Sequence, residues 1–80
     1  MWASLSLPPD LFLHAARALD FNPARTIVVE DSPLGVQGAT AAGMTVIGYA
    51  EIVSAERLRA AGAVVTVERL ADVAALLGLR

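Results

Sequence analysis

Residues 26–43 read TIVVEDSPLGVQGATAAG, and this stretch decides the fold. It opens with Thr26–Glu30, a β-branched run that ends in two adjacent carboxylates, Glu30 and Asp31. A short apolar run of this kind predicts a fully buried strand of a parallel sheet, with charge at its carboxyl end. Burying both acids without a partner would be costly, so a cation or an arginine is expected nearby.

The second half of the stretch predicts a helix with defined ends. Ser32 stands where an N-cap is expected, Pro33 suits the first helical turn, and Gly43 suits the residue that ends the helix. The whole stretch therefore predicts a strand, an acidic turn and a helix. In open α/β sheets such turns, at the carboxyl ends of the strands, are where ligands bind.

The flanking segments alternate in the same way. The sequence predicts, in order, a helix opening at Pro8-Pro9-Asp10 with Phe12, Ala15, Ala16 and Leu19 on its buried face, a strand over 45–49, a helix over 54–61 capped by Ser54 and ended by Gly62, a strand over 63–67, and a last helix marked by Leu70, Val73, Ala74 and Leu77. Strands that alternate with helices imply βαβ units and a parallel sheet. The predicted class is α/β, with about three parallel strands and about four helices.

Length and composition indicate one small, incomplete domain. Eighty residues bury only about 60% of the surface that their unfolded chain exposes. Yet 56% of the residues are hydrophobic and the mean hydropathy is +0.61, as in the core of something larger. We expect residues 1–7 to be irregular and residues 8–80 to form the α/β part.

Charge and cysteine content exclude several classes of protein. The net charge is −2 and the six basic residues, all arginines, form no cluster, which argues against a nucleic-acid partner. No cysteine is present, so neither disulfides nor thiolate metal sites are expected. No apolar run approaches the ~20 residues of a membrane span. We therefore expect a cytoplasmic protein without a membrane partner.

The motif VVEDSPLGVQGATAAGM, residues 28–44, resembles the fourth motif of the haloacid dehalogenase (HAD) superfamily, in its β-phosphoglucomutase-like and sugar-phosphatase branch. The upstream PDLFLHAARAL is similar to the helix that follows the lysine motif of that branch, so the resemblance covers most of residues 8–62. It implies the C-terminal part of a Rossmann-like, magnesium-dependent phosphatase or phosphomutase. Its implied substrates are small phosphorylated metabolites such as sugar phosphates, and their selection belongs to a cap domain.

The resemblance assigns Glu30 and Asp31 to a Mg²⁺ site, and hard carboxylate ligands suit that ion. The alternative from spacing alone is that the pair interacts with the positive end of the helix. Ser32 and the following amides could bind phosphate, or Ser32 could be an N-cap and nothing more. Gly35 and Gly38 cost helix stability, which close approach of the helix to the sheet would explain better than a phosphate contact.

The chain departs from the family pattern where catalysis is concerned. No Asp-x-Asp pair, the source of the nucleophile and the acid/base, occurs in these residues, so no catalytic residue is assigned. The position of the motif lysine holds Ser6. His14 is expected on the exposed side of its helix without a catalytic role. Arg57 and Arg59 are expected to form solvated ion pairs with nearby glutamates.

Two hypotheses follow. In the first, the chain is part of a hydrolase, inactive alone and completed by an N-terminal segment. In the second, it is a non-catalytic interaction module with a HAD-derived fold. The resemblance implies that the strand carrying the nucleophile would lie beside Ile27–Val29. Because that strand is absent, we expect an exposed apolar edge and self-association, with Trp2 as an anchor.

Overall fold

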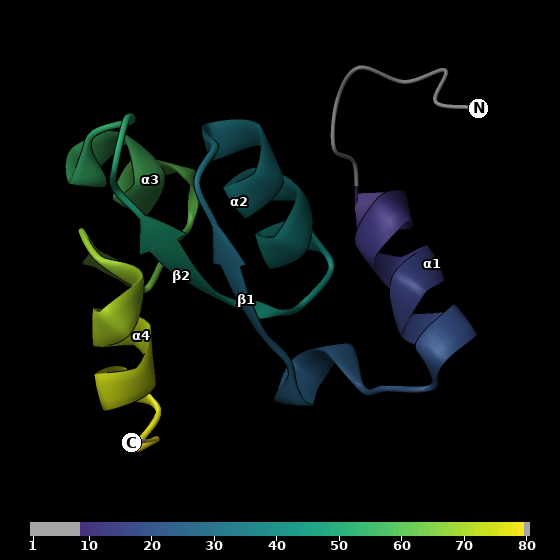
Figure 1. The fold of residues 1–80 in the computed structure, drawn as a ribbon. Helices are drawn as coiled ribbons and strands as arrows, with labels where there is room; N and C mark the ends of the chain where they lie inside the picture. The colour runs from purple at the N-terminus through teal and green to yellow at the C-terminus, as the bar shows by residue number, and fades with distance from the viewer. Residues whose placement is uncertain (1–8, 80) are drawn as a thin grey trace.

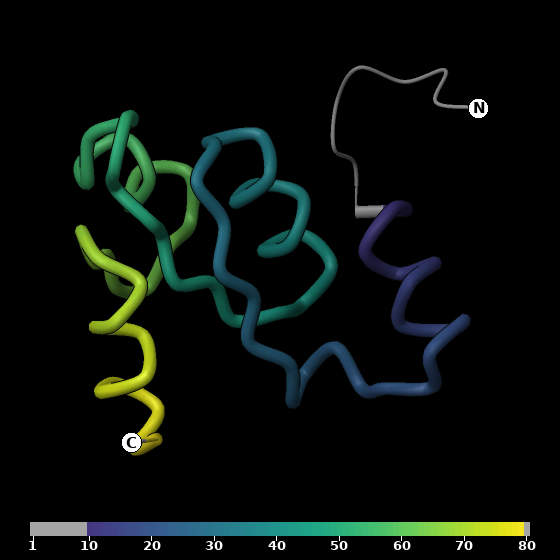
Figure 2. Tube along the Cα trace, in the orientation of Figure 1, coloured from purple at the N-terminus to yellow at the C-terminus, as the bar shows by residue number. Residues whose placement is uncertain are grey.

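The computed structural model describes residues 9–79. They form α1 (Pro9–Leu19), a 3₁₀ turn (Pro23–Arg25), β1 (Ile27–Glu30), α2 (Pro33–Ala41), β2 (Thr45–Tyr49), α3 (Ala55–Ala61), β3 (Val65–Val67) and α4 (Leu70–Leu76). Figure 1 shows how the helices and strands are arranged, and Figure 2 shows the course of the chain. The predicted α/β class, with three strands and four α-helices, is confirmed. The expectations for Trp2, Ser6 and the irregular N-terminus lie outside the described residues.

The three strands form one parallel sheet in the order β1-β2-β3. Val29 lies opposite Ile47, which in turn lies opposite Val65. At the carboxyl end of β1, Glu30 lies opposite Gly48. The carboxyl ends of β1 and β2 therefore lie side by side, next to the acidic turn.

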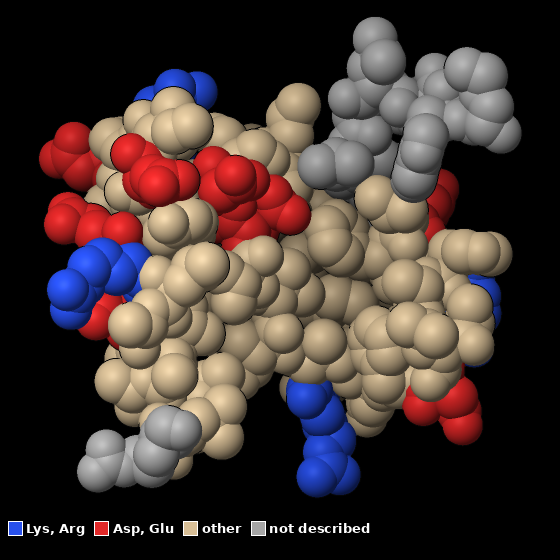
Figure 3. Space-filling model, in the orientation of Figure 1, with Lys and Arg blue, Asp and Glu red and all other residues tan. Residues whose placement is uncertain are grey.

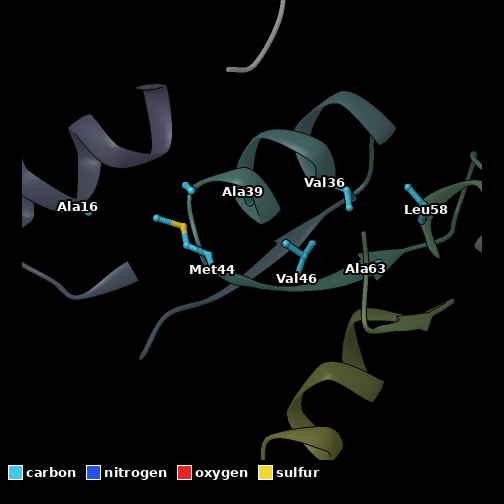
Figure 4. Packing of buried hydrophobic residues seen from close by; sticks show 8 residues of the cluster. Ala16, Val36, Ala39, Met44, Val46, Leu58 and Ala63 are labelled. Atoms are coloured by element: carbon cyan, nitrogen blue, oxygen red, sulfur yellow. The ribbon is translucent and has the colours of Figure 1, made fainter. Parts of the chain in front are cut away.

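The hydrophobic core lies between the sheet and the helices α2 and α3 (Figure 4). Its largest fully buried side chains are Val36 of α2, Val46 of β2 and Leu58 of α3. Five more buried residues complete it: Ala16, Ala39, Ala42, Met44 and Ala63. Ala16 brings α1 to this core, and α1 packs beside α2. No helix among the described residues is long and apolar enough to cross a bilayer.

The helix ends are those that the sequence predicts. The Ser32 hydroxyl accepts a hydrogen bond of 3.0 Å from the Gly35 amide at the start of α2. Gly43 follows α2 with φ of 87° and Gly62 ends α3 with φ of 132°, in the left-handed region that favours glycine. These caps fix where each helix stops and where the next strand begins.

The prediction that the first strand is fully buried is wrong. Ile27 is 48% exposed and Val29 is 41% exposed, whereas Val28 between them packs against the core. The reason is that the side chains of β1 alternate between the two faces of the sheet, and α2 covers the face of Val28. Within the described residues β1 lies at the edge of the sheet, so the expectation of an exposed apolar edge over Ile27–Val29 is confirmed for Ile27 and Val29 but not for Val28.

Three local predictions are corrected. Leu19 is 73% exposed because it lies at the very end of α1, and Leu13 packs against the core instead. The third strand begins at Val65, since Ala63 lies in the loop between α3 and β3 although it is buried. Arg59 donates a hydrogen bond to the Thr66 hydroxyl rather than pairing with a glutamate.

Candidate functional site

The candidate site lies at the carboxyl ends of β1 and β2, where the acidic turn leads into α2. Figure 3 shows acidic side chains gathered over this end of the sheet. The register that places Glu30 opposite Gly48 also brings Tyr49, the last residue of β2, close to Asp31. Glu51 follows two residues later. The fold thus assembles side chains from two turns that are about twenty residues apart in the sequence.

Glu30 is half-buried and its carboxylate turns back onto the acidic turn. Its Oε1 accepts hydrogen bonds from the Asp31 amide at 3.1 Å, the Ser32 amide at 3.3 Å and the Ser32 hydroxyl at 3.2 Å. Hydrogen bonds to a charged acceptor are stronger than those between neutral groups. The turn is therefore held together around one oxygen of Glu30.

Gly35 explains why Glu30 can fold back in this way. A Cβ at Gly35 would overlap the carboxylate group of Glu30. The glycine is thus required for a close approach, as the sequence predicted, but the approaching group is the Glu30 side chain rather than the sheet backbone. Glycine destabilises the helix by about 1 kcal/mol relative to alanine, but it leaves room for the Glu30 carboxylate.

Asp31 and Ser32 differ in what their side chains do. Asp31 is exposed, so its carboxylate is free to meet a ligand from solvent. The Ser32 hydroxyl donates to Glu30 and accepts from the Gly35 amide. This is the N-cap role that the sequence predicted for Ser32. The expectation that both acids would be buried is wrong, because no charged side chain among the described residues is fully buried.

Tyr49 is a residue of the site that the sequence reasoning missed. Burial raises the pKa of its hydroxyl above the usual value of 10.0, and the charges of Glu51 and Asp31 raise the pKa further. The sequence feature that could have identified Tyr49 is its place at the carboxyl end of a strand that neighbours an acidic turn. The hydroxyl stays protonated at neutral pH and remains a hydrogen-bond donor beside the carboxylates.

Replacing Glu51 with glutamine should lower the pKa of Tyr49 toward 10.0, and Asp31→Asn should lower it less, because Glu51 has the larger effect of the two. Phenolate absorbance in the near ultraviolet measures this directly, since the chain has one tyrosine. The folded-state pKa is raised, so the contribution of Tyr49 to stability is complete below pH 10 and is lost as the pH rises through that folded-state value. An unchanged Tyr49 titration in Glu51→Gln would contradict the assignment.

The donor set fits Mg²⁺ in kind. Mg²⁺ prefers hard oxygen ligands and is held in proteins by one or two carboxylates together with water and phosphate oxygens. Asp31 and the second oxygen of Glu30 supply such donors. Residues 9–79 contain no group of three or more His, Cys, Asp or Glu side chains that could hold a metal by themselves. A groove of about 560 Å³ lies elsewhere, between β3 and α4.

The remaining candidates lie outside the site. His14 is exposed on α1, as predicted. Arg57 and Arg59 are exposed on α3, and neither forms the predicted ion pair. The one ion pair within residues 9–79 joins Arg69 and Asp72 at 3.6 Å. None of the arginines within residues 9–79 forms an ion pair with Glu30 or Asp31, so the compensating arginine expected from the sequence is not found there.

Comparison with known proteins points in one direction. No family model matches the sequence. The structure of a haloacid dehalogenase-like protein of unknown function from Agrobacterium tumefaciens matches 98% of this chain and 37% of its own, with a TM-score of 0.86 and 38% identity. A HAD family hydrolase from Deinococcus radiodurans, solved with bound phosphate and sodium, matches 89% of this chain and 33% of its own, with a TM-score of 0.80 and 33% identity.

A curated relative agrees. The β-phosphoglucomutase of Bacillus subtilis is 40% identical over 43 residues, which are 54% of this chain and 19% of the enzyme. The chain thus spans about a third of the length of the two solved structures, and the aligned part is about a fifth of the mutase. The comparisons of fold and of sequence agree. The chain therefore belongs to the haloacid dehalogenase superfamily of hydrolases.

Proposed function

We propose that this chain is the acidic-turn segment of a magnesium-dependent phosphatase or phosphomutase that acts in the cytoplasm on small phosphorylated metabolites such as sugar phosphates. The observation that carries the proposal is the exposed Asp31 carboxylate at the carboxyl end of β1, within a fold shared with HAD hydrolases. A relative solved with phosphate and sodium, and another that is a β-phosphoglucomutase, support the phosphate chemistry.

In this proposal the acidic turn holds the cation and leaves the covalent step to another part of the enzyme. Asp31 would be a ligand of the Mg²⁺, with Glu30 beside it. The ion would supply positive charge that offsets the phosphate oxygens, which is how phosphoryl-transfer enzymes stabilise their transition states. Because these residues hold no Asp-x-Asp pair, activity requires a complementing segment that carries one.

Mg²⁺ binding to this chain should be weak, with a Kd on the order of 1 mM, because two carboxylates leave most of the coordination to water. Asp31→Asn should abolish the binding, while Glu56→Gln, which removes an exposed acid on α3, should leave it unchanged. Amide chemical shifts during a Mg²⁺ titration report both variants. Binding that survives in Asp31→Asn would reject the proposed metal site.

A second candidate function, self-association, has its own observation. The edge of β1 has no partner strand in residues 9–79, and Ile27 and Val29 are exposed along it. Such an edge is a template for pairing with another chain. We propose that a second copy pairs with it. Antiparallel pairing centred on Val28 would set Ile27 against Val29 and bring Arg25 toward Asp31 of the second copy, which complements the charges at the two ends of the strand.

The chain should therefore form a discrete dimer that Val29→Lys disperses, because a charge on the edge opposes strand pairing. Val29 is the right position, since its side chain is exposed, whereas Val28 packs against the core. Ile52→Lys is the matched control, because Ile52 is 90% exposed and lies away from the edge. Light scattering after size-exclusion chromatography distinguishes the states. A monodisperse monomer of the unmodified chain would refute the proposal.

A further inference from the structure

We propose that the free edge of β3 is a docking site for an extended segment of a partner protein, which adds a strand to the sheet and places a basic side chain beside Glu68 and Asp72. Among residues 9–79, β3 forms the edge of the sheet opposite β1. The proposed pairing of β1 with a second copy therefore leaves the β3 edge open, and the acidic turn takes no part in this binding.

A groove of about 560 Å³ runs along the β3 edge. Four consecutive residues line it: Val65, Thr66, Val67 and Glu68. Side chains of consecutive strand residues point to opposite faces of a sheet, so a groove that touches all four follows the edge of the strand rather than one face. Its volume lies within the range of about 300–1,000 Å³ that is usual for ligand sites.

Two helices form the walls of the groove. Ala55, the first residue of α3, lines it together with three residues of α4, namely Asp72, Ala75 and Leu76. The helix α3 covers the face of the sheet that holds the core, and α4 packs against β3. The strand edge therefore lies on the floor of a groove between helices, where an extended chain can lie along it.

The backbone of β3 directs hydrogen-bonding groups toward this groove. The Val67 carbonyl accepts a hydrogen bond of 2.7 Å from the Ala50 amide, so Val67 faces the β2 side of the strand. Backbone groups alternate in direction along a strand, so the amide and carbonyl of Thr66 face the free edge. An extended segment that pairs with these groups binds by strand addition, in which main-chain hydrogen bonds supply affinity and side-chain contacts supply specificity.

Charge selects the segment that fits. Glu68 is exposed at the carboxyl end of β3 and forms no ion pair with any residue in 9–79. Asp72 has an exposed partner, Arg69, at 3.6 Å, and such surface pairs are weak enough for another cation to compete. The rest of the lining is mostly apolar. Antiparallel pairing, the more stable arrangement, puts the first residue of the segment beside Glu68, so that residue should be a lysine or an arginine.

Three blocked pentapeptides probe the edge. They are Lys-Val-Thr-Val-Thr, the same peptide with glutamate in place of lysine, and the same peptide with proline in place of the central threonine, which removes an N–H donor. The lysine peptide should shift the amide resonances of residues 65–68 with a Kd on the order of 1 mM, and it should slow hydrogen exchange of the Thr66 amide. We expect about threefold weaker binding of the glutamate peptide and at least tenfold weaker binding of the proline peptide.

Two variants of residue 66 separate strand addition from side-chain binding. Thr66→Pro removes the amide that faces the groove, and proline is tolerated in edge strands where the N–H points away from the sheet. Thr66→Val keeps that amide and removes only the hydroxyl that Arg59 binds. Thr66→Pro should bind the lysine peptide at least tenfold more weakly, whereas Thr66→Val should stay within about twofold of the unmodified chain.

Glu68→Lys tests the charge and leaves the strand intact, because Glu68 is exposed. This variant should reverse the preference, so that the glutamate peptide binds about threefold more tightly than the lysine peptide. It decides the question even where Thr66→Pro fails to fold, which circular dichroism detects. An unchanged preference in Glu68→Lys would contradict the docking site.

The other outcomes that would overturn the proposal are also distinct. These are an absence of shifts at residues 65–68 well above the expected Kd, shifts confined to Ile27–Glu30, and equal affinity for the lysine and proline peptides. Shifts at residues 65–68 that grow with protein concentration before any peptide is added would assign the edge to a second copy instead of a partner. All of these measurements are made without Mg²⁺, so failure of the proposed metal site leaves them unaffected.

Discussion

Replacing Leu58 with alanine should lower the free energy of unfolding by about 2–5 kcal/mol, the range for a fully buried large-to-small substitution. Leu58 is 0% exposed, and it fills the space between α3 and the sheet beside Gly48 and Ala63. A domain of this size has only about 5–15 kcal/mol of stability, so the loss should shift the urea midpoint substantially or unfold the chain.

The control is Ile52→Ala. Ile52 is 90% exposed, so its truncation should change the free energy of unfolding by less than about 0.5 kcal/mol. Urea denaturation followed by circular dichroism compares the two variants under the same conditions. If Leu58→Ala were no more destabilised than Ile52→Ala, the core between α3 and the sheet would not be the one described.

These eighty residues by themselves should hydrolyse p-nitrophenyl phosphate and sugar phosphates no faster than the buffer does, even at saturating Mg²⁺. The chain contains no Asp-x-Asp pair to provide a nucleophile and no lysine to offset the charge of a bound phosphate. Phosphoryl transfer depends on positioned charge, and one acidic turn cannot supply it. The chain should therefore lack the rate enhancement of a complete enzyme, which is commonly about a millionfold or more.

Asp31→Asn is the informative control for that assay, because it separates turnover by this chain from turnover by a contaminating phosphatase. Any activity that the substitution leaves unchanged belongs to a contaminant. Turnover that Asp31→Asn abolishes would instead show that the chain is a complete catalyst, and it would overturn the proposal that another segment contributes the nucleophile.

Local chemistry in the sequence predicted most of the fold. The caps at Ser32 and Ser54 and the glycines at 43 and 62 each act within one helical turn, so residue identity is enough to place them. The alternation of apolar strands and helices gave the parallel sheet for the same reason. The acidic turn at the end of β1 was predicted because a β-branched run precedes it and a capped helix follows it.

Only the tertiary structure decided how the two acids differ and which residues join them. The Glu30 carboxylate folds back because Gly35 leaves room beside it, and this depends on the angle at which α2 meets the strand. Tyr49 reaches the site through the register of β1 and β2, which no local pattern specifies. The exposure of Ile27 and Val29 likewise depends on which face of the sheet the helices cover. Helix caps depend on neighbours a few residues away, whereas the surroundings of a side chain at a strand end depend on segments that are distant in the sequence, and these meet only when the sheet forms.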